Sequence, residues 1–67
     1  MNKKLLKAEM VIFGDTRATL AAYLGIAPTT LSYKMNESHG RCFDKKEIEA
    51  IAERYSLNEE KIISIFF

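Results

Sequence analysis

The sequence predicts an all-α protein in which five short helices form a single compact domain over residues 1–67. Apolar residues recur three and four positions apart, which is the spacing of one face of a helix. Residues that begin or end helices, such as Thr16, Gly25 and Asn58, border these stretches. A chain of 67 residues buries about 60% of the surface that its unfolded form exposes. So small a core leaves little room for an enclosed active site, and we expect neither an enzyme nor a cofactor.

The first helix is predicted from about Lys3 to Phe13, with Leu6, Met10 and Phe13 on its inner side. Gly14 and Asp15 then end it.

The second and third helices are predicted to form a helix-turn-helix. Thr16 caps a helix that ends at Leu24, and the third helix runs from Pro28 to about Met35. Gly25 takes the left-handed conformation of the corner without the steric cost of a side chain. The side chains expected to face inward are Leu20, Ala21, Leu24, Ile26, Leu31 and Met35. Ala21 lies where two steeply crossed helices come closest, so a larger residue there would separate them.

Two more helices follow a polar loop at 36–42. Asp44 and Glu47 form a capping pair at the start of the fourth helix. Its apolar face is predicted to consist of Ile48, Ile51, Ala52 and Tyr55. Ser56 ends this helix, and Asn58 caps a short last one.

The stretch from Thr16 to Asn36 resembles the Cro/CI-type (XRE) helix-turn-helix family of phage and plasmid repressors, whose usual string is Thr-Gln-x-x-Leu-Ala-x-x-Leu-Gly-Ile-Ser-x-x-Thr-Leu-Ser. The residues that agree are Thr16, Leu20, Ala21, Leu24, Gly25, Ile26, Thr30, Leu31 and Ser32. Arg17 stands where the family often has Gln, and Ala27 where it usually has Ser. The resemblance extends over nearly the whole chain. It implies a five-helix, lambda-repressor-like fold and a repressor that binds operator DNA, of phage or prophage origin.

If the third helix enters the major groove, its outward residues are the candidate base readers. They are Pro28, Thr29, Ser32, Tyr33 and Asn36. Pro28 has no hydrogen-bonding side chain and offers apolar contact alone, so we expect moderate specificity with a contribution from DNA shape. Alternatively, Thr29 and Ser32 are ordinary exposed residues, and the ring of Tyr33 lies over the protein's own surface.

The candidate phosphate contacts are Arg17, Lys34 and Arg41, with Asn36 and Lys45 as further candidates. Arg17 begins the second helix and is the strongest of them. An Arg in place of Gln exchanges a neutral contact for a charge-assisted one and loses Gln's ability to brace a neighbouring side chain. The alternative for Arg17 is a solvated helix residue.

Charge is divided unevenly along the chain, although its net value is only +1. Residues 1–46 hold eight basic and four acidic side chains, whereas residues 47–67 hold two basic and five acidic ones. This segregation favours a molecule that turns one face toward phosphates, although chance clustering of solvated charges gives the same pattern.

The carboxyl-terminal segment is apolar on nearly every side. One helix face cannot bury all of it, so part is expected to complete the core against Leu6 and Ile51, and the remainder to form an interface patch. We predict a homodimer through Ile62, Ile65, Phe66 and Phe67. A monomer that buries the whole segment is the alternative.

Other chemistry has little support. His39 and Cys42 are too few to make a zinc site, and Cys42 is expected to be a small core residue beside Phe43. No stretch is long enough to span a membrane and no signal peptide is evident, so a cytoplasmic protein is expected. The competing function is a protein-interaction module that keeps the fold and binds another regulator through the terminal apolar patch.

Overall fold

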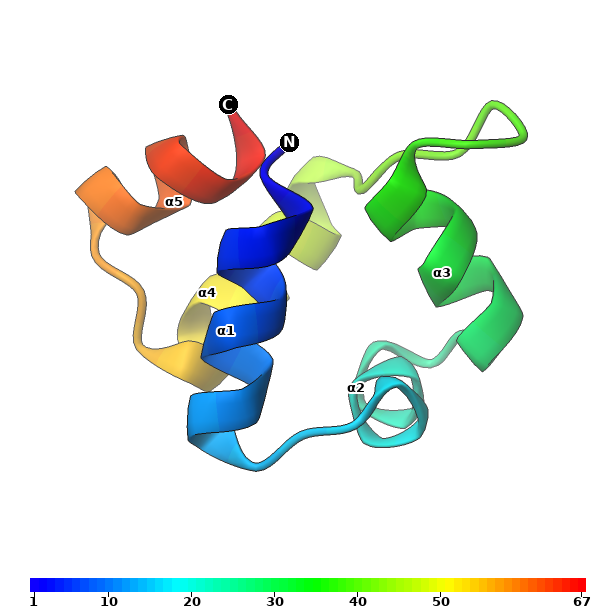
Figure 1. Ribbon diagram of the computed structural model, residues 1–67, viewed down its shortest axis with the longest axis horizontal. Helices are drawn as coiled ribbons and strands as arrows, with labels where there is room; N and C mark the ends of the chain where they lie inside the picture. Colours follow the sequence, from blue (N-terminus) through cyan, green and yellow to red (C-terminus); the bar gives the residue numbers. More distant parts are fainter.

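The structure of the chain, a computed structural model, describes residues 1–67 and contains five α-helices and no strand (Figure 1). The helices are α1 (Lys3–Phe13), α2 (Arg17–Leu24), α3 (Pro28–Asn36), α4 (Lys45–Tyr55) and α5 (Glu59–Phe66). The predicted all-helical class is thus confirmed. The bounds agree with those expected from the sequence, except that α3 continues one residue further, to Asn36.

Local hydrogen bonds explain where the helices begin and end. The predicted caps Thr16, Asp44 and Asn58 each accept a bond from the backbone N–H three residues later. Gly14 and Gly25 end α1 and α2 in the left-handed conformation, with φ angles of 92° and 72°.

Each helix contributes one large, fully buried side chain to a common core. These side chains are Leu6, Leu20, Leu31, Ile51 and Ile65, in the order of the helices. Burial of a Leu or Ile side chain is worth about 1.5–3 kcal/mol, so all five helices are needed to close the core. Phe43, from the loop before α4, joins them.

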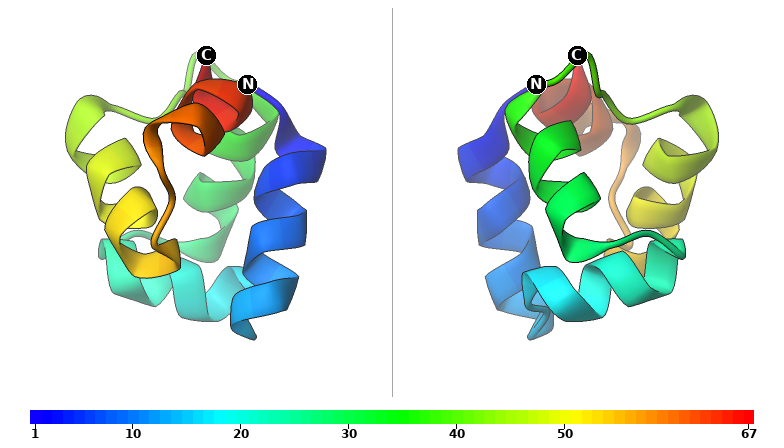
Figure 2. Two further views of the ribbon diagram at one scale, coloured as in Figure 1. Left: turned by 90° about the vertical axis from the view of Figure 1, so that its left-hand side faces the viewer. Right: turned by 90° about the vertical axis from the view of Figure 1, so that its right-hand side faces the viewer.

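The helices form two packed groups. α1, α4 and α5 lie against one another, while α2 and α3 make up the other group (Figure 1). The chain ends lie side by side at the edge of the first group (Figure 2), where the N–H of Asn2 donates to the carbonyl of Ile65 at 2.6 Å.

α2 and α3 cross steeply: in Figure 1, α2 is seen along its axis while α3 lies across the view. Three residues separate them, and Ala21 is fully buried. Ala21 is therefore in the core, and its methyl side chain takes up little space there.

Two residues predicted to be in the core are exposed instead. Phe13 is 51% exposed, because the end of α1 lies at the surface and its ring packs beside Tyr55 and Arg54. Cys42 is exposed because the next residue, Phe43, is the one whose side chain turns inward. None of the five helices combines the length and the apolar character needed to cross a membrane.

Candidate functional site

The outward face of α3 is the first part of the candidate site. Leu31 and Met35 bury its inner face. The predicted readers on its other sides are exposed or partly exposed: Pro28, Thr29, Ser32, Tyr33 and Asn36. Ala27 provides no side-chain cap, so the N–H groups of Thr29 and Thr30 in the first turn donate to no protein acceptor. This end of α3 therefore offers both side-chain and backbone hydrogen-bond donors to solvent.

Arg17 joins the start of α2 to the middle of α3. Its Nη1 donates to Ser32 Oγ at 2.7 Å, and Ser32 Oγ donates in turn to the carbonyl of Pro28 at 3.2 Å. The expectation that Arg17 gives up the bracing role of Gln was therefore wrong: the longer side chain reaches Ser32, one helical turn along α3. Arg17 is an ordered cation beside the polar face of α3.

Lys3 connects α1 to the other end of α3. Its Nζ donates to Asn36 Oδ1 at 2.6 Å. Sequence reasoning did not single out Lys3, because the partners are 33 residues apart and no local pattern links them.

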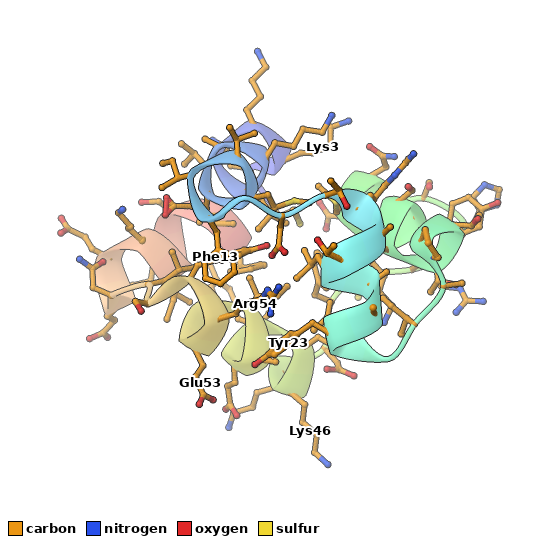
Figure 3. All side chains as sticks on the ribbon, turned by 90° about the horizontal axis from the view of Figure 1, so that it is seen from below. Lys3, Phe13, Tyr23, Lys46, Glu53 and Arg54 are labelled. Carbon is orange, nitrogen blue, oxygen red and sulfur yellow. The ribbon has the colours of Figure 1, made fainter.

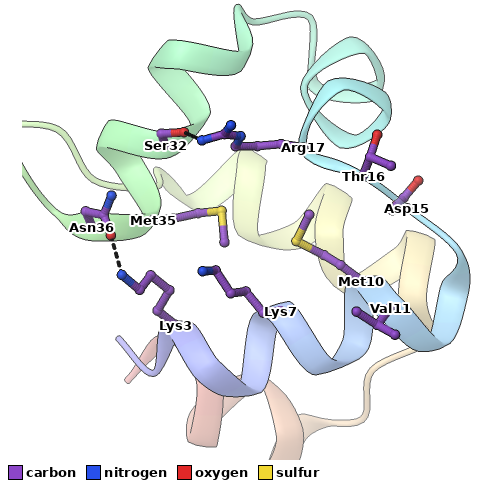
Figure 4. A pocket seen from close by; sticks show the side chains of 10 residues that line it. All are labelled: Lys3, Lys7, Met10, Val11, Asp15, Thr16, Arg17, Ser32, Met35 and Asn36. Atoms are coloured by element: carbon purple, nitrogen blue, oxygen red, sulfur yellow. Dashed lines mark hydrogen bonds between the residues drawn. The ribbon is translucent and has the colours of Figure 1, made fainter.

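A cleft of about 470 Å³ separates α1 from α2 and α3 (Figure 4). The residues that line this α1–α2–α3 cleft are Lys3, Lys7, Met10, Val11, Asp15, Thr16, Arg17, Ser32, Met35 and Asn36. In Figure 4, Lys3 and Lys7 rise from α1 toward α3, and Arg17 extends from the opposite side. The cleft thus gathers cations from two helices next to two of the predicted readers.

The ring of Tyr33 lies over the protein's own surface. It packs against the imidazole of His39, with 4.1 Å between ring centroids and an interplanar angle of 43°. This is the alternative that the sequence left open for Tyr33, and we leave Tyr33 out of the proposed contacts.

Lys34 is occupied by an ion pair. Its Nζ lies 2.6 and 2.8 Å from the carboxylate oxygens of Glu47, and the two side chains are only 14% and 13% exposed. The spacing along α3 places Lys34 on an outward side, but its long stem turns toward α4 instead. As a free phosphate contact Lys34 was therefore predicted wrongly.

Arg41 and Lys45 are exposed on the loop after α3 and in the first turn of α4, respectively. Neither forms an ion pair with the protein. Both remain available to an external anion.

In the lining of the cleft, Asp15 is held by four hydrogen bonds. Arg54 donates through Nε at 2.7 Å and Nη2 at 2.8 Å, Tyr55 OH donates at 2.7 Å, and Thr19 Oγ1 donates at 2.8 Å. Only 3% of the Asp15 side chain is exposed. The guanidinium of Arg54 lies between the rings of Phe13 and Tyr23, 4.7 and 4.5 Å from their centroids (Figure 3).

This network shifts the titration of its members. The hydrogen bonds from Arg54 hold the pKa of Asp15 well below its usual range, although burial acts in the opposite direction. Burial raises the pKa of Tyr55, and its hydrogen bond to Asp15 adds to the shift. Asp15 therefore stays ionised and Tyr55 stays neutral over the physiological range, and the network ties the start of α2 to α4.

The four residues predicted to form a dimer interface differ in their exposure to solvent. Ile65 is 2% exposed and belongs to the core, so its assignment to an interface was wrong. Ile62 and Phe66 are partly buried, and the ring of Phe66 packs edge-on against Phe43. Phe67 is 84% exposed. Of the four residues, Phe67 alone presents most of its surface to solvent.

The sequence matches no protein-family model, and no curated protein or solved structure is significantly similar to the chain.

Proposed function

We propose that the chain is a sequence-specific DNA-binding transcriptional regulator, with α2 and α3 as a helix-turn-helix in a lambda-repressor-like arrangement. In this proposal α3 enters the major groove of double-stranded DNA, and occupancy of an operator represses transcription. The resemblance of residues 16–36 to Cro/CI-type repressors supports this function and a phage-related origin. Such a regulator would act in the cytoplasm.

The observation that carries the proposal is the way α2 presents α3. Ala21 allows a close, steep crossing, the inner face of α3 is buried, and the opposite face is polar with Arg17 beside it. A helix of about 10–12 Å diameter fits a major groove about 12 Å wide.

The residues divide into readers and phosphate contacts. Thr29, Ser32 and Asn36 carry polar groups for base edges, and Pro28 offers apolar contact with a thymine methyl. The phosphate contacts are Arg17, Arg41 and Lys45, which are all exposed.

We further propose a homodimer that uses the exposed Phe67 and the partly exposed Ile62 and Phe66. A two-fold axis would separate the two copies of α3 by about 34 Å, one turn of DNA, and so would require a palindromic operator.

A second candidate function is a protein-interaction module. Its support is a set of exposed apolar side chains on α1 and at the end of the chain, namely Val11 (76% exposed), Ile12 (80%), Ile63 (54%) and Phe67 (84%). Exposed apolar surface of this kind is typical of interfaces.

Selection of duplexes from a random DNA pool by the purified protein separates the two functions. We expect a palindrome with half-sites one turn apart. About three phosphate contacts per subunit predict a slope near −5 for the logarithm of dimer affinity against that of salt concentration. Absence of enrichment, with weak binding that hardly depends on salt, would exclude the operator-binding function and favour the protein partner.

Two substitutions then assign the roles. Arg17→Ala should weaken binding to all sequences and flatten the salt slope. Ser32→Ala should change the preference at particular base pairs by roughly 1–3 kcal/mol. Lys61→Ala, on α5 with a side chain that is 57% exposed, is the matched charge control and should change neither property. Equal effects of Ser32→Ala on every sequence would remove Ser32 from the readers.

A further inference from the structure

The α1–α2–α3 cleft is strongly cationic. Lys3, Lys7 and Arg17 line it, and Asp15 is its one acidic residue. The carboxylate of Asp15 is already neutralised by Arg54, at 2.7 and 2.8 Å. The cleft therefore holds three positive charges with no free carboxylate beside them, and its local potential favours the approach of an anion.

The three cations are weakly engaged in the free protein. Lys3 donates to the side-chain amide of Asn36 and Arg17 to the hydroxyl of Ser32. Lys7 forms no ion pair and donates no hydrogen bond to the protein, although it is exposed toward the cleft. An oxyanion attracts these donors more strongly than the neutral amide and hydroxyl do, because it adds the Coulombic attraction between opposite charges.

The start of α2 adds two further donors at the same place. The backbone N–H groups of Arg17 and Ala18 precede the first intrahelical bond of α2, which Leu20 donates to the carbonyl of Thr16. The positive end of the helix dipole therefore acts in the same direction as the side chains. Met10 and Met35 are 6% and 5% exposed and give the cleft a partly apolar wall, which reduces screening by water.

We propose that the α1–α2–α3 cleft binds a phosphate group, with Lys7 as its unengaged cation, and that Lys3 and Arg17 leave Asn36 and Ser32 to join it. This inference rests on the proposed function when the phosphate belongs to the backbone of operator DNA. In that case, the movement of Lys3 and Arg17 to the DNA phosphate frees Asn36 and Ser32 on α3. Contact with the DNA backbone thereby releases two side chains for the reading of bases.

Inorganic phosphate is the first probe, because it tests the cleft without DNA. Phosphate is titrated into the full chain at constant ionic strength, with chloride as the reference anion, and NMR follows the side-chain signals of Lys7, Arg17 and Asn36. We expect saturable shifts with phosphate and none with chloride. Lys7→Gln should weaken phosphate binding about tenfold, the loss expected for one charged hydrogen bond.

Lys4→Gln is the matched control, since Lys4 is an exposed lysine of the same helix that does not line the cleft. It removes the same charge and should leave the phosphate shifts unchanged. Lys7 is itself exposed, so both variants should keep the circular dichroism spectrum and melting temperature of the wild type. If Lys4→Gln weakened phosphate binding as much as Lys7→Gln, the proposal would be overturned, because a general effect of charge would explain both results.

DNA binding provides the second arm. In DNA binding Lys7 adds one phosphate contact per subunit to those of Arg17, Arg41 and Lys45, which makes the salt slope steeper. Lys7→Gln should therefore reduce the slope by about 0.9 per subunit, and Lys4→Gln should not. Saturable phosphate shifts in a chain that selects no DNA would refute the proposed function and support the cleft as a site for free phosphate. A reduced slope without shifts from inorganic phosphate would assign the site to backbone phosphate. Operator binding with an unchanged slope in Lys7→Gln, together with no saturable shift, would refute the inference and leave the proposed function standing.

Discussion

Substitution of Asp15 by Asn tests whether the partly buried ion pair of Asp15 and Arg54 holds the two groups of helices together. The amide keeps the shape of the carboxylate but removes its charge and turns one acceptor into a donor facing other donors. Arg54 would keep its charge without a partner, with only 20% of its side chain exposed. Hydrogen bonds to charged groups contribute about 1.5–3 kcal/mol. We expect a loss of about 2 kcal/mol, because the pair is partly buried and the edge of the guanidinium reaches water.

That loss is large for this chain. At about 0.05–0.15 kcal/mol per residue, a domain of 67 residues has roughly 3–10 kcal/mol of total stability. With a urea dependence of about 1 kcal/mol/M, the denaturation midpoint of Asp15→Asn should fall by about 2 M.

Urea denaturation followed by circular dichroism measures this midpoint. Lys61→Gln, which breaks the exposed contact to Glu9 at 3.5 Å, is the control and should cost less than about 1 kcal/mol. A loss for Asp15→Asn no greater than that of the control would refute the reasoning that the ion pair is a main stabilising contact.

The pH dependence follows from the same carboxylate. The pKa of Asp15 is lowered in the folded state, so folding favours the ionised form. Its contribution is complete above the unfolded pKa of about 4 and is lost as the pH falls below that value. Wild-type stability should therefore decrease from about pH 5 downward, and the decrease should be smaller in Asp15→Asn. Parallel acid curves for the two proteins would contradict this assignment.

Three further predictions concern the fold and the site. The raised pKa of Tyr55 means that its contribution is present below the unfolded pKa of about 10 and is lost as the pH rises through the folded value; Tyr55→Phe should remove this alkaline loss in a denaturation series at pH 9–12. Ala21→Leu should cost about 2 kcal/mol by overpacking the crossing of α2 and α3, whereas Ala22→Leu, at an exposed neighbour, should cost little in the same urea assay. Lys34→Gln should lower stability by about 1 kcal/mol through loss of its half-buried ion pair and leave the salt slope of DNA binding unchanged.

The helices were predictable because the signals that define them are local. The cap Thr16 and its bonding partner are three residues apart, and Gly25 ends α2 by its own conformational freedom. The inner faces repeat at helical spacing, so Leu20 and Leu31 were assigned to the core correctly. Where the donor and the acceptor lie within one turn of a helix, a short stretch of sequence is enough to predict the hydrogen bond.

Contacts between distant side chains were not predictable in this way. The hydrogen bond between Asp15 and Arg54 joins residues 39 positions apart. The sequence around either residue gives no sign of its partner. Lys34 lies on an outward side of α3 by spacing, yet its flexible stem reaches Glu47. The end of the chain presents a related difficulty. The last turn of α5 is apolar on most sides, so the packing of α5 against α1 and α4 determines that Ile65 is buried.

The ion pair of Asp15 and the α1–α2–α3 cleft depend on each other. Asp15 stands two residues before Arg17, and its bond to Thr19 fixes the first turn of α2 from which Arg17 extends. An unpaired carboxylate at this place would cancel one of the cations of the cleft. Because Arg54 reaches it from the side of α4, Asp15 can anchor α2 without drawing Arg17 or Lys7 to itself. The pair of Asp15 and Arg54 therefore keeps the cations of the cleft available to an external phosphate.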